Sequence, residues 1–129
     1  MDKKVLLLID DEKDFCKLVK LNLEQISDYE VLTAYDGKEG IDLARKHKPD
    51  LILLDIMMPV MDGLTVLKIL KEDFNTMGIP VVILTAKGDD LTRIKAIWSY
   101  SQEYVVKPIE AEALKEKIDA VLLKKKKQK

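Results

Sequence analysis

Residues 50–63 have the sequence DLILLDIMMPVMDG, in which four apolar residues, Leu51 to Leu54, lead directly into the acidic Asp55. A continuous apolar run with turn residues at its ends is typical of a strand that is buried on both faces. Such strands belong to parallel sheets that helices cover on both sides. The stretch therefore predicts a buried strand that ends in a carboxylate, and it raises the question of what that carboxylate does there.

Strand-like and helix-like segments alternate along the rest of the chain. The apolar runs are Val5–Ile9, Val31–Ala34, Leu51–Leu54, Val81–Leu84 and Tyr104–Val106. The polar-rich stretches between them place apolar residues three or four positions apart, as amphipathic helices do. This alternation predicts an α/β fold with a single doubly wound sheet of five parallel strands, right-handed crossovers and helices on both faces. The second run is the least apolar, which suits an edge strand.

The apolar spacing within the helical stretches predicts which side chains face the sheet. In the first two stretches these are Phe15, Leu18, Val19, Leu23 and Ile26, followed by Ile41 and Ala44. In the last three they are Leu64, Leu67, Leu70 and Phe74, then Leu91, Ile94 and Ile97, and finally Leu114, Ile118, Val121 and Leu122. No repeat or linker interrupts the pattern. We therefore expect one domain over residues 1–123 and a basic C-terminal tail over residues 124–129.

The composition limits the classes of function. With 47% hydrophobic and 35% charged residues, the chain has the composition of an ordinary globular protein. The N-terminal apolar run is too short for a signal peptide, so we expect none, and no apolar run approaches the roughly 18 residues that span a membrane. Cys16 is the single cysteine, so no internal disulfide can form, and we expect a cytoplasmic protein that does not bind membranes. Residues 1–123 carry 17 basic against 23 acidic residues, a net charge of −6, which argues against a nucleic-acid-binding face on the domain.

Polar residues stand where four of the predicted strands end. They are Asp10 and Asp11 after the first run, Asp55 after the third, Thr85 after the fourth and Lys107 after the fifth. Because the carboxyl ends of parallel strands share one edge of an open sheet, where ligands bind at the switch in strand order, we expect these side chains to converge. A single Asp after a strand is usually a helix cap or turn residue, and Asp11 and Asp62 suit that interpretation. That interpretation weakens when four strand ends supply residues suited to the same chemistry.

The predicted cluster fits phosphoryl transfer assisted by a divalent cation. Three carboxylates repel one another, and a hard cation such as Mg²⁺ relieves the repulsion, keeps several waters and accepts a phosphate oxygen. The ammonium of Lys107 and the hydroxyl of Thr85 suit the oxygens of a phosphoryl group. One carboxylate would be the nucleophile, because carboxylates form aspartyl-phosphate intermediates and such transfer depends mainly on positioning and charge neutralisation.

At this point the residues resemble a known family. The segments that carry the resemblance are Asp10-Asp11-Glu12, Asp55 with Pro59 and Asp62-Gly63, Thr85-Ala86, and Tyr104-Val105-Val106-Lys107-Pro108. Over residues 3–123 the chain is similar to the response regulator receiver domain of bacterial two-component signalling and chemotaxis. The resemblance implies a flavodoxin-like (βα)5 fold with the strand order 2-1-3-4-5, for which the chemotaxis member is an established example. It also implies a cis bond between Lys107 and Pro108.

The resemblance implies a phosphoacceptor and a metal site. Asp55 would accept a phosphoryl group from the phosphohistidine of a sensor histidine kinase or from a phosphotransfer protein. Mg²⁺, with Mn²⁺ as the alternative ion, would be bound directly by Asp11, by Asp55 and by the backbone carbonyl of Met57. Asp10 would act mainly through a bound water. No other cofactor is expected.

The resemblance also implies a conformational switch. Lys107 would pair with the phosphoryl group, Thr85 would bond to one of its oxygens, and Tyr104 would swing inward as Thr85 moves. The last two helices and the last strand would then bind a downstream partner or output domain. Such a domain is not a turnover enzyme, although it catalyses its own phosphorylation and autodephosphorylation. We expect a monomer or a weak, phosphorylation-dependent dimer.

The chain departs from the family pattern just before the last strand. The family often has Gly-Ala there, followed by an acidic pair, where this chain has Tyr100-Ser101 and Gln102-Glu103. These altered charges weaken the expectation of a dimer through the last-helix face.

Two other classes of function stay open from the sequence. Magnesium-dependent phosphatases or nucleases on a similar sheet generally need an Asp-x-Asp pair at one strand end, and position 57 is Met. Proteins that bind nucleotides or flavins need a Gly-rich phosphate loop after the first strand, where Asp10 and Asp11 would repel phosphate.

Overall fold

The computed structural model describes residues 3–86 and 103–127. The elements, in chain order, are β1 (Val5–Ile9), α1 (Lys13–Ile26), β2 (Glu30–Ala34), α2 (Gly37–His47), β3 (Leu51–Asp55), α3 (Gly63–Glu72), β4 (Val81–Ala86), β5 (Glu103–Lys107) and α5 (Ala111–Lys127). Each predicted strand forms with ends close to those expected from its apolar run. The expected helix with Leu91, Ile94 and Ile97, and the departures from Tyr100 to Gln102, lie outside the described residues.

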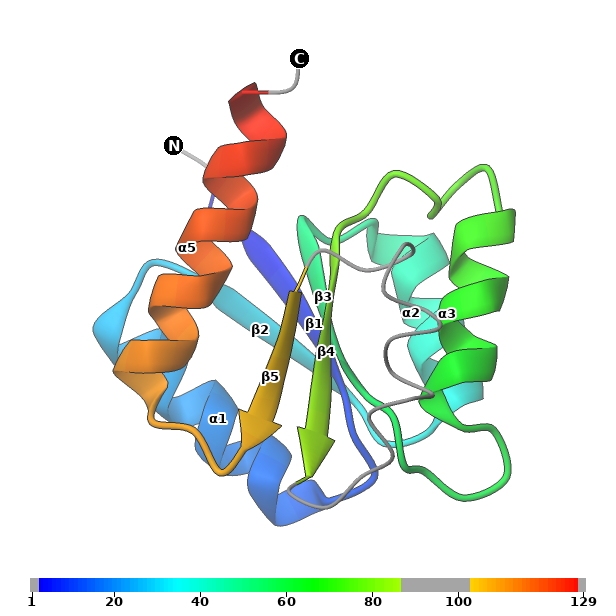
Figure 1. The fold of residues 1–129 in the computed structure, drawn as a ribbon, viewed down its shortest axis with the longest axis horizontal. Coiled ribbons are helices and arrows are strands. Elements are labelled where there is room, and N and C mark those ends of the chain that lie inside the picture. The colour runs from blue at the N-terminus through cyan, green and yellow to red at the C-terminus, as the bar shows by residue number, and fades with distance from the viewer. Residues whose placement is uncertain (1–2, 87–102, 128–129) are drawn as a thin grey trace.

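The strands of the described residues form one five-stranded parallel sheet in the order β2-β1-β3-β4-β5, which confirms the predicted fold (Figure 1). β3 lies at the centre, between β1 and β4, and all of its residues are buried, as its continuous apolar run predicts. β2 lies at one edge, and its first residue, Glu30, is exposed. The weaker apolar run of β2 therefore matches its edge position.

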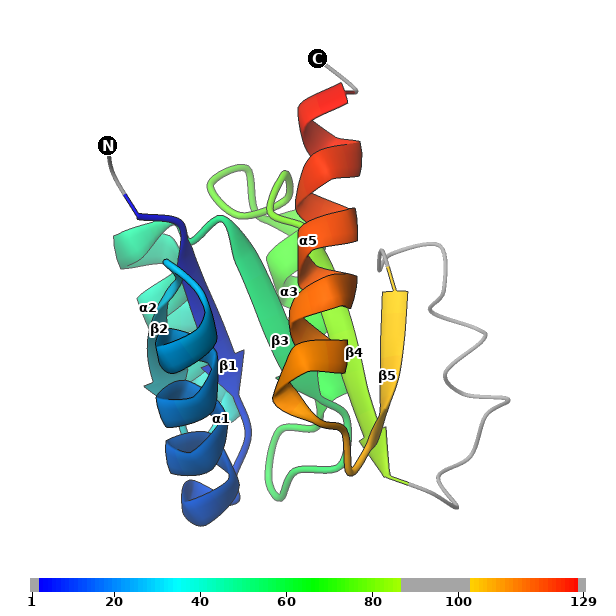
Figure 2. The same cartoon turned by 90° about the vertical axis from the view of Figure 1, so that its left-hand side faces the viewer.

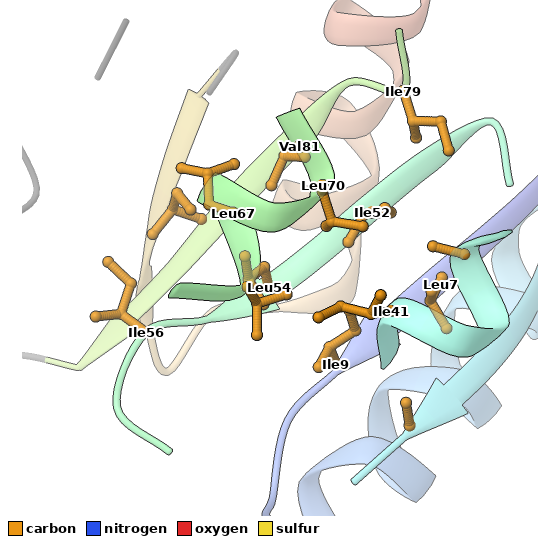
Figure 3. Close-up of a cluster of buried hydrophobic side chains, with 14 of the residues drawn as sticks. Leu7, Ile9, Ile41, Ile52, Leu54, Ile56, Leu67, Leu70, Ile79 and Val81 are labelled. Carbon is orange, nitrogen blue, oxygen red and sulfur yellow. The ribbon is translucent and has the colours of Figure 1, made fainter. Parts of the chain in front are cut away.

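Helices cover both faces of the sheet, with α2 and α3 on one face and α1 and α5 on the other (Figure 2). Alternate residues of each strand enter the two cores, so Leu7 and Ile9 pack with α2 and α3 whereas Leu6 and Leu8 pack with α1 and α5. Figure 3 shows the first core, in which Leu67 of α3 packs on the sheet. Each such side chain stabilises the fold by ~1.5–3 kcal/mol when it is fully buried.

Three apolar side chains that were expected to face the sheet are exposed instead, so these predictions were wrong. Leu18 is 57% exposed, Ile26 37% and Phe74 92%. The buried face of α1 contains Cys16 and Leu23, and Leu18 lies two positions from Cys16, about 200° around the helix axis. Phe74 follows the end of α3 and so cannot continue the apolar stripe of that helix. Helical spacing alone did not fix which side of α1 meets the sheet or where α3 ends.

The last helix continues into the basic end of the chain. α5 runs to Lys127, and the ammonium of Lys125 donates a hydrogen bond to the backbone carbonyl of Gly78 in the connection between α3 and β4. The boundary between a domain over residues 1–123 and a separate tail stays a prediction. None of the helices in the described residues combines the length and the apolar character needed to cross a bilayer.

Candidate functional site

The topology brings the predicted site residues to one edge of the sheet, where the strand arrows end in Figure 1. Asp55 is the last residue of β3, and Asp10 and Asp11 follow the adjacent β1. Lys107 is the last residue of β5, and Thr85 lies one residue before the end of the adjacent β4. The convergence expected from parallel strands is therefore present.

The ammonium of Lys107 lies between two buried carboxylates. Its Nζ atom is 2.7 Å from Oδ2 of Asp10 and 3.6 Å from Oδ1 of Asp55. The side chains of Lys107, Asp10 and Asp55 are 12%, 0% and 6% exposed, so little solvent screens these charges. Attraction between opposite charges is stronger in such surroundings than in water, and the loss of Lys107 would leave the buried carboxylates of Asp10 and Asp55 without its positive charge. Lys107 thus neutralises part of the carboxylate charge at the end of β3.

Burial makes the carboxylates of the site hard to ionise. Burial, and then the charge of Asp10, raise the pKa of Asp55 to about 7, although the ammonium of Lys107 opposes the shift. Burial also raises the pKa of Asp10, against the effect of its ion pair with Lys107. Burial by itself would lower the pKa of Lys107, but the surrounding carboxylates of Asp10 and Asp55 outweigh it and raise that pKa. One ammonium therefore does not compensate the negative charge, and the site favours binding a further cation or a proton.

Three acidic side chains are arranged as ligands for such a cation. Asp10, Asp11 and Asp55 each offer a carboxylate oxygen, and these oxygens lie within 4.8 Å of one another. Oδ2 of Asp10 is fully buried and accepts no well-formed hydrogen bond from the described residues. It forms an ion pair with the ammonium of Lys107. Carboxylate oxygens are the ligands that Mg²⁺ prefers, and one or two of them usually suffice beside water. The acidic cluster is therefore compatible with magnesium binding.

Gly63 holds the loop after β3 against the end of that strand. Its N–H group donates a 2.8 Å hydrogen bond to the carbonyl of Ile56. A Cβ atom at position 63 would lie 2.3 Å from the carbonyl oxygen of Asp55, so the backbone can approach this closely only at a glycine. Asp62 begins α3 by accepting a 2.9 Å hydrogen bond from the N–H of Thr65, which confirms its predicted role as a cap. The loop is thereby anchored directly behind the proposed nucleophile.

Met57 and Met58 follow Asp55 and differ in environment. The backbone N–H of Met57 acts to lower the pKa of Asp55, against the larger effect of burial, and the side chain of Met57 is 57% exposed. Met58 is buried and packs in the core with α2 and α3. The backbone of Met57 therefore lies beside the carboxylate cluster, and metal binding by its carbonyl stays a prediction.

The two predicted switch residues lie on neighbouring strands. Thr85 is buried, and its hydroxyl donates a long, 3.4 Å hydrogen bond to the carbonyl of Ala86. Tyr104 is half-buried, packs against the core with α2 and α3, and pairs with Ile83 in the sheet, two residues before Thr85. This adjacency agrees with a coupling between the two side chains, and their roles in switching stay predictions.

Three further residues contact the site and were not predicted to do so. Oε1 of Glu12 is 3.2 Å from the Lys107 ammonium, which also lies 4.5 Å from the centre of the Phe15 ring. The thiol of Cys16 donates a 3.3 Å hydrogen bond to the backbone carbonyl of Asp10, and burial raises its pKa to about 12, so the thiol stays protonated. Glu12 is the N-cap residue of α1, and Phe15 and Cys16 lie in its first turn. Their closeness in the sequence to Asp10 and Asp11 could have indicated that they contact the site.

Comparisons with known proteins agree with this geometry. The family model described as the response regulator receiver domain matches residues 6–119 of the chain. The chain is a response regulator receiver domain. The cis Lys107–Pro108 bond that was expected for this family is present in the structure.

Relatives of this receiver domain include transcriptional regulators. The alkaline phosphatase synthesis transcriptional regulatory protein PhoP of Bacillus subtilis is 36% identical over 122 residues, which are 95% of this chain and 49% of that protein. The DNA-binding dual master transcriptional regulator RpaA of Synechocystis is 40% identical over 117 residues, 91% of this chain and 48% of that protein. The chain therefore spans about half the length of these two relatives.

Solved structures share the fold of this receiver domain. The CheY-like response regulator receiver domain protein from Methanospirillum hungatei has a TM-score of 0.88 and 25% identity, and the match covers 99% of this chain and 100% of that one. Receiver domains are the phosphoaccepting modules of two-component systems. Membership of the family therefore favours that function over a magnesium-dependent phosphatase.

Proposed function

We propose that Asp55 is the phosphoacceptor of this receiver domain. The observation that carries the proposal is the position of its carboxylate at the end of the central strand, 3.6 Å from the ammonium of Lys107 and within the cluster formed with Asp10 and Asp11. A carboxylate oxygen of Asp55 attacks the phosphorus atom of the donor. The P–N bond of a phosphohistidine breaks, and its electron pair returns to the imidazole nitrogen. Lys107 balances negative charge on the phosphoryl oxygens, since such transfer depends mainly on position and electrostatics.

Magnesium completes the proposed site, with manganese as the alternative ion. Asp11, Asp55 and the backbone carbonyl of Met57 would hold the ion directly, and Asp10 would hold it through water. When bound, the cation neutralises charge on the phosphoryl oxygens. The raised pKa of Asp55, about 7, supports this assignment, because an added positive charge favours the ionised carboxylate that attack requires.

Phosphorylation of Asp55 would shift the domain between two conformations. The phosphoryl group adds roughly two negative charges, which attract the hydroxyl of Thr85 and the ammonium of Lys107. Tyr104 would follow Thr85 inward and change the surface that includes β5 and α5. The size of the shift depends on how differently a partner binds the two conformations.

The proposed partners are proteins. A sensor histidine kinase or a phosphotransfer protein supplies the phosphoryl group, and a downstream protein or output domain binds the surface altered by the switch. The domain catalyses transfer to itself and its own dephosphorylation rather than the turnover of a separate substrate. We propose that it acts in the cytoplasm as a monomer or a weak phosphorylation-dependent dimer, without contacting nucleic acid or membrane.

Intact-mass spectrometry after incubation with acetyl phosphate and MgCl₂ tests the proposal. The wild-type protein should gain one phosphoryl group, and the Asp55→Asn variant should gain none. Asp42→Asn, which removes an exposed carboxylate of α2, is the matched control and should be labelled like the wild type. Labelling of the Asp55 variant at the wild-type level would show that another residue is the acceptor.

A further inference from the structure

Glu12 directly precedes α1, but its side chain does not cap the helix. It is the N-cap residue, and its side chain makes no capping hydrogen bond there. Its carboxylate instead reaches across to β5, where Oε1 accepts a 3.2 Å hydrogen bond from Nζ of Lys107. The contact joins residues 95 positions apart in the chain. Glu12 therefore contacts the ammonium that is proposed to bind the phosphoryl group.

The carboxylate partners of Lys107 differ greatly in exposure. The side chain of Asp10 is 0% exposed and that of Asp55 is 6% exposed, whereas that of Glu12 is 65% exposed. The ammonium also lies 4.5 Å from the centre of the Phe15 ring. Lys107 is therefore held between a buried acidic interior and a solvated acidic residue at the rim of the site.

We propose that Glu12 is a positioning residue: its carboxylate holds the Lys107 ammonium at the rim of the site until a phosphoryl group on Asp55 takes the place of that carboxylate. This inference rests on the proposed function of Asp55 and Lys107. The carboxylates of Asp10, Glu12 and Asp55 all lie within 3.6 Å of the ammonium, so phosphoryl oxygens compete with them for its three N–H donors. Loss of Asp10 would leave a buried unpaired carboxylate, which is costly. Loss of the contact between Lys107 and Glu12 costs little, because the exposed carboxylate of Glu12 is then hydrated by water. Glu12 is thus the partner that Lys107 exchanges.

The proposal predicts that removal of Glu12 strengthens binding of a phosphoryl group. Beryllofluoride, which binds an aspartate carboxylate as a phosphoryl mimic, is a suitable probe in the presence of MgCl₂. Because exposed ion pairs are weak, we expect Glu12→Gln to bind beryllofluoride about two- to fivefold more tightly than the wild type. Glu12→Asp keeps the charge but withdraws the carboxylate by one methylene, and it should shift the affinity in the same direction.

A matched control separates the contact from the general effect of charge. Asp14 is an exposed acidic residue in the first turn of α1, and among the described residues its carboxylate is not a partner of Lys107. Asp14→Asn removes the same charge as Glu12→Gln and should leave the beryllofluoride affinity within error of the wild type. In the metal-free protein, the NMR signals of the Lys107 side chain should shift in Glu12→Gln and stay unchanged in Asp14→Asn.

The outcomes distinguish this inference from the function on which it rests. Tighter binding by Glu12→Gln but not by Asp14→Asn, together with shifted Lys107 signals in Glu12→Gln, supports the positioning role. Equal affinity of Glu12→Gln and wild type would overturn it, and so would an equal gain in Asp14→Asn, while the function of Asp55 would stand. A wild-type protein that binds no beryllofluoride at Asp55 would overturn both.

Discussion

Replacement of Asp55 by Asn is expected to stabilise the metal-free protein at neutral pH, although it removes the proposed phosphoacceptor. Burial and the charge of Asp10 raise the pKa of Asp55 from its ordinary 3.8 to about 7 in the folded state. Because the folded-state pKa is the higher one, the native state binds the proton more tightly, and stability falls as the pH rises from about 4 to about 7. A pKa difference of about three corresponds to about 4 kcal/mol. The attraction to Lys107 is already included in that pKa, while the amide of Asn is still a buried polar group, so we expect a net gain of about 2–4 kcal/mol.

Urea unfolding in the presence of a chelator measures this gain. The Asp55→Asn variant should be more stable than the wild type at about pH 8. The difference should shrink to about 1 kcal/mol at about pH 4.5, because this pH lies only slightly above the ordinary pKa of 3.8 that the carboxyl has in the unfolded state. Asp42→Asn, on the exposed side of α2, should change stability by less than about 0.5 kcal/mol at either pH. A variant that is no more stable than the wild type at about pH 8, or a gain that is the same at both pH values, would refute the reasoning.

Three further predictions concern the loop, the core and the cation. Gly63→Ala should destabilise the fold by about 1–3 kcal/mol or more in urea unfolding and slow labelling by acetyl phosphate, because its Cβ would lie 2.3 Å from the carbonyl oxygen of Asp55. Gly78→Ala is the control and should be near neutral in urea unfolding, because its Cβ would have open space around it. Leu23→Ala should lower the free energy of unfolding, measured by calorimetry, by about 2–5 kcal/mol, and Leu18→Ala by less than about 1 kcal/mol, because Leu23 is fully buried and Leu18 is exposed. Similar losses of stability in the two variants would contradict the packing of α1. MgCl₂ at about 100 times its dissociation constant should stabilise the wild type by about 2.7 kcal/mol and Asp55→Asn by clearly less, and an equal rise in thermal midpoint would place the ion elsewhere.

The fold followed from the sequence because its strands carry an unusually clear signal. The run Leu51–Leu54 is apolar without alternation and has turn residues near both ends, which is typical of a strand covered on both faces, and β3 is that strand. The helical faces were harder to predict. Leu18 and Phe74 fit an apolar spacing, but the rotation of α1 and the end of α3 are set by packing against the sheet, which the spacing does not contain.

The site followed from the sequence as far as backbone topology determines it. Asp10, Asp55 and Lys107 meet because parallel strands end at one edge, a rule that needs no side-chain detail. The contact of Glu12 with Lys107 depends on which way two long side chains extend between α1 and β5. The raised pKa of Asp55 depends on the depth of its burial. Neither property can be obtained from the order of residues, because both arise from the packed tertiary structure.

Reductive trapping of the phosphorylated residue tests the assignment of Asp55 most directly. Borohydride reduces an aspartyl phosphate to homoserine, and peptide mass spectrometry then locates the altered residue. After incubation of the wild-type protein with acetyl phosphate and MgCl₂, we predict homoserine at position 55, and none when a chelator replaces the magnesium. Homoserine at another aspartate, or no trapped residue in a protein that carries the label, would contradict phosphorylation of Asp55.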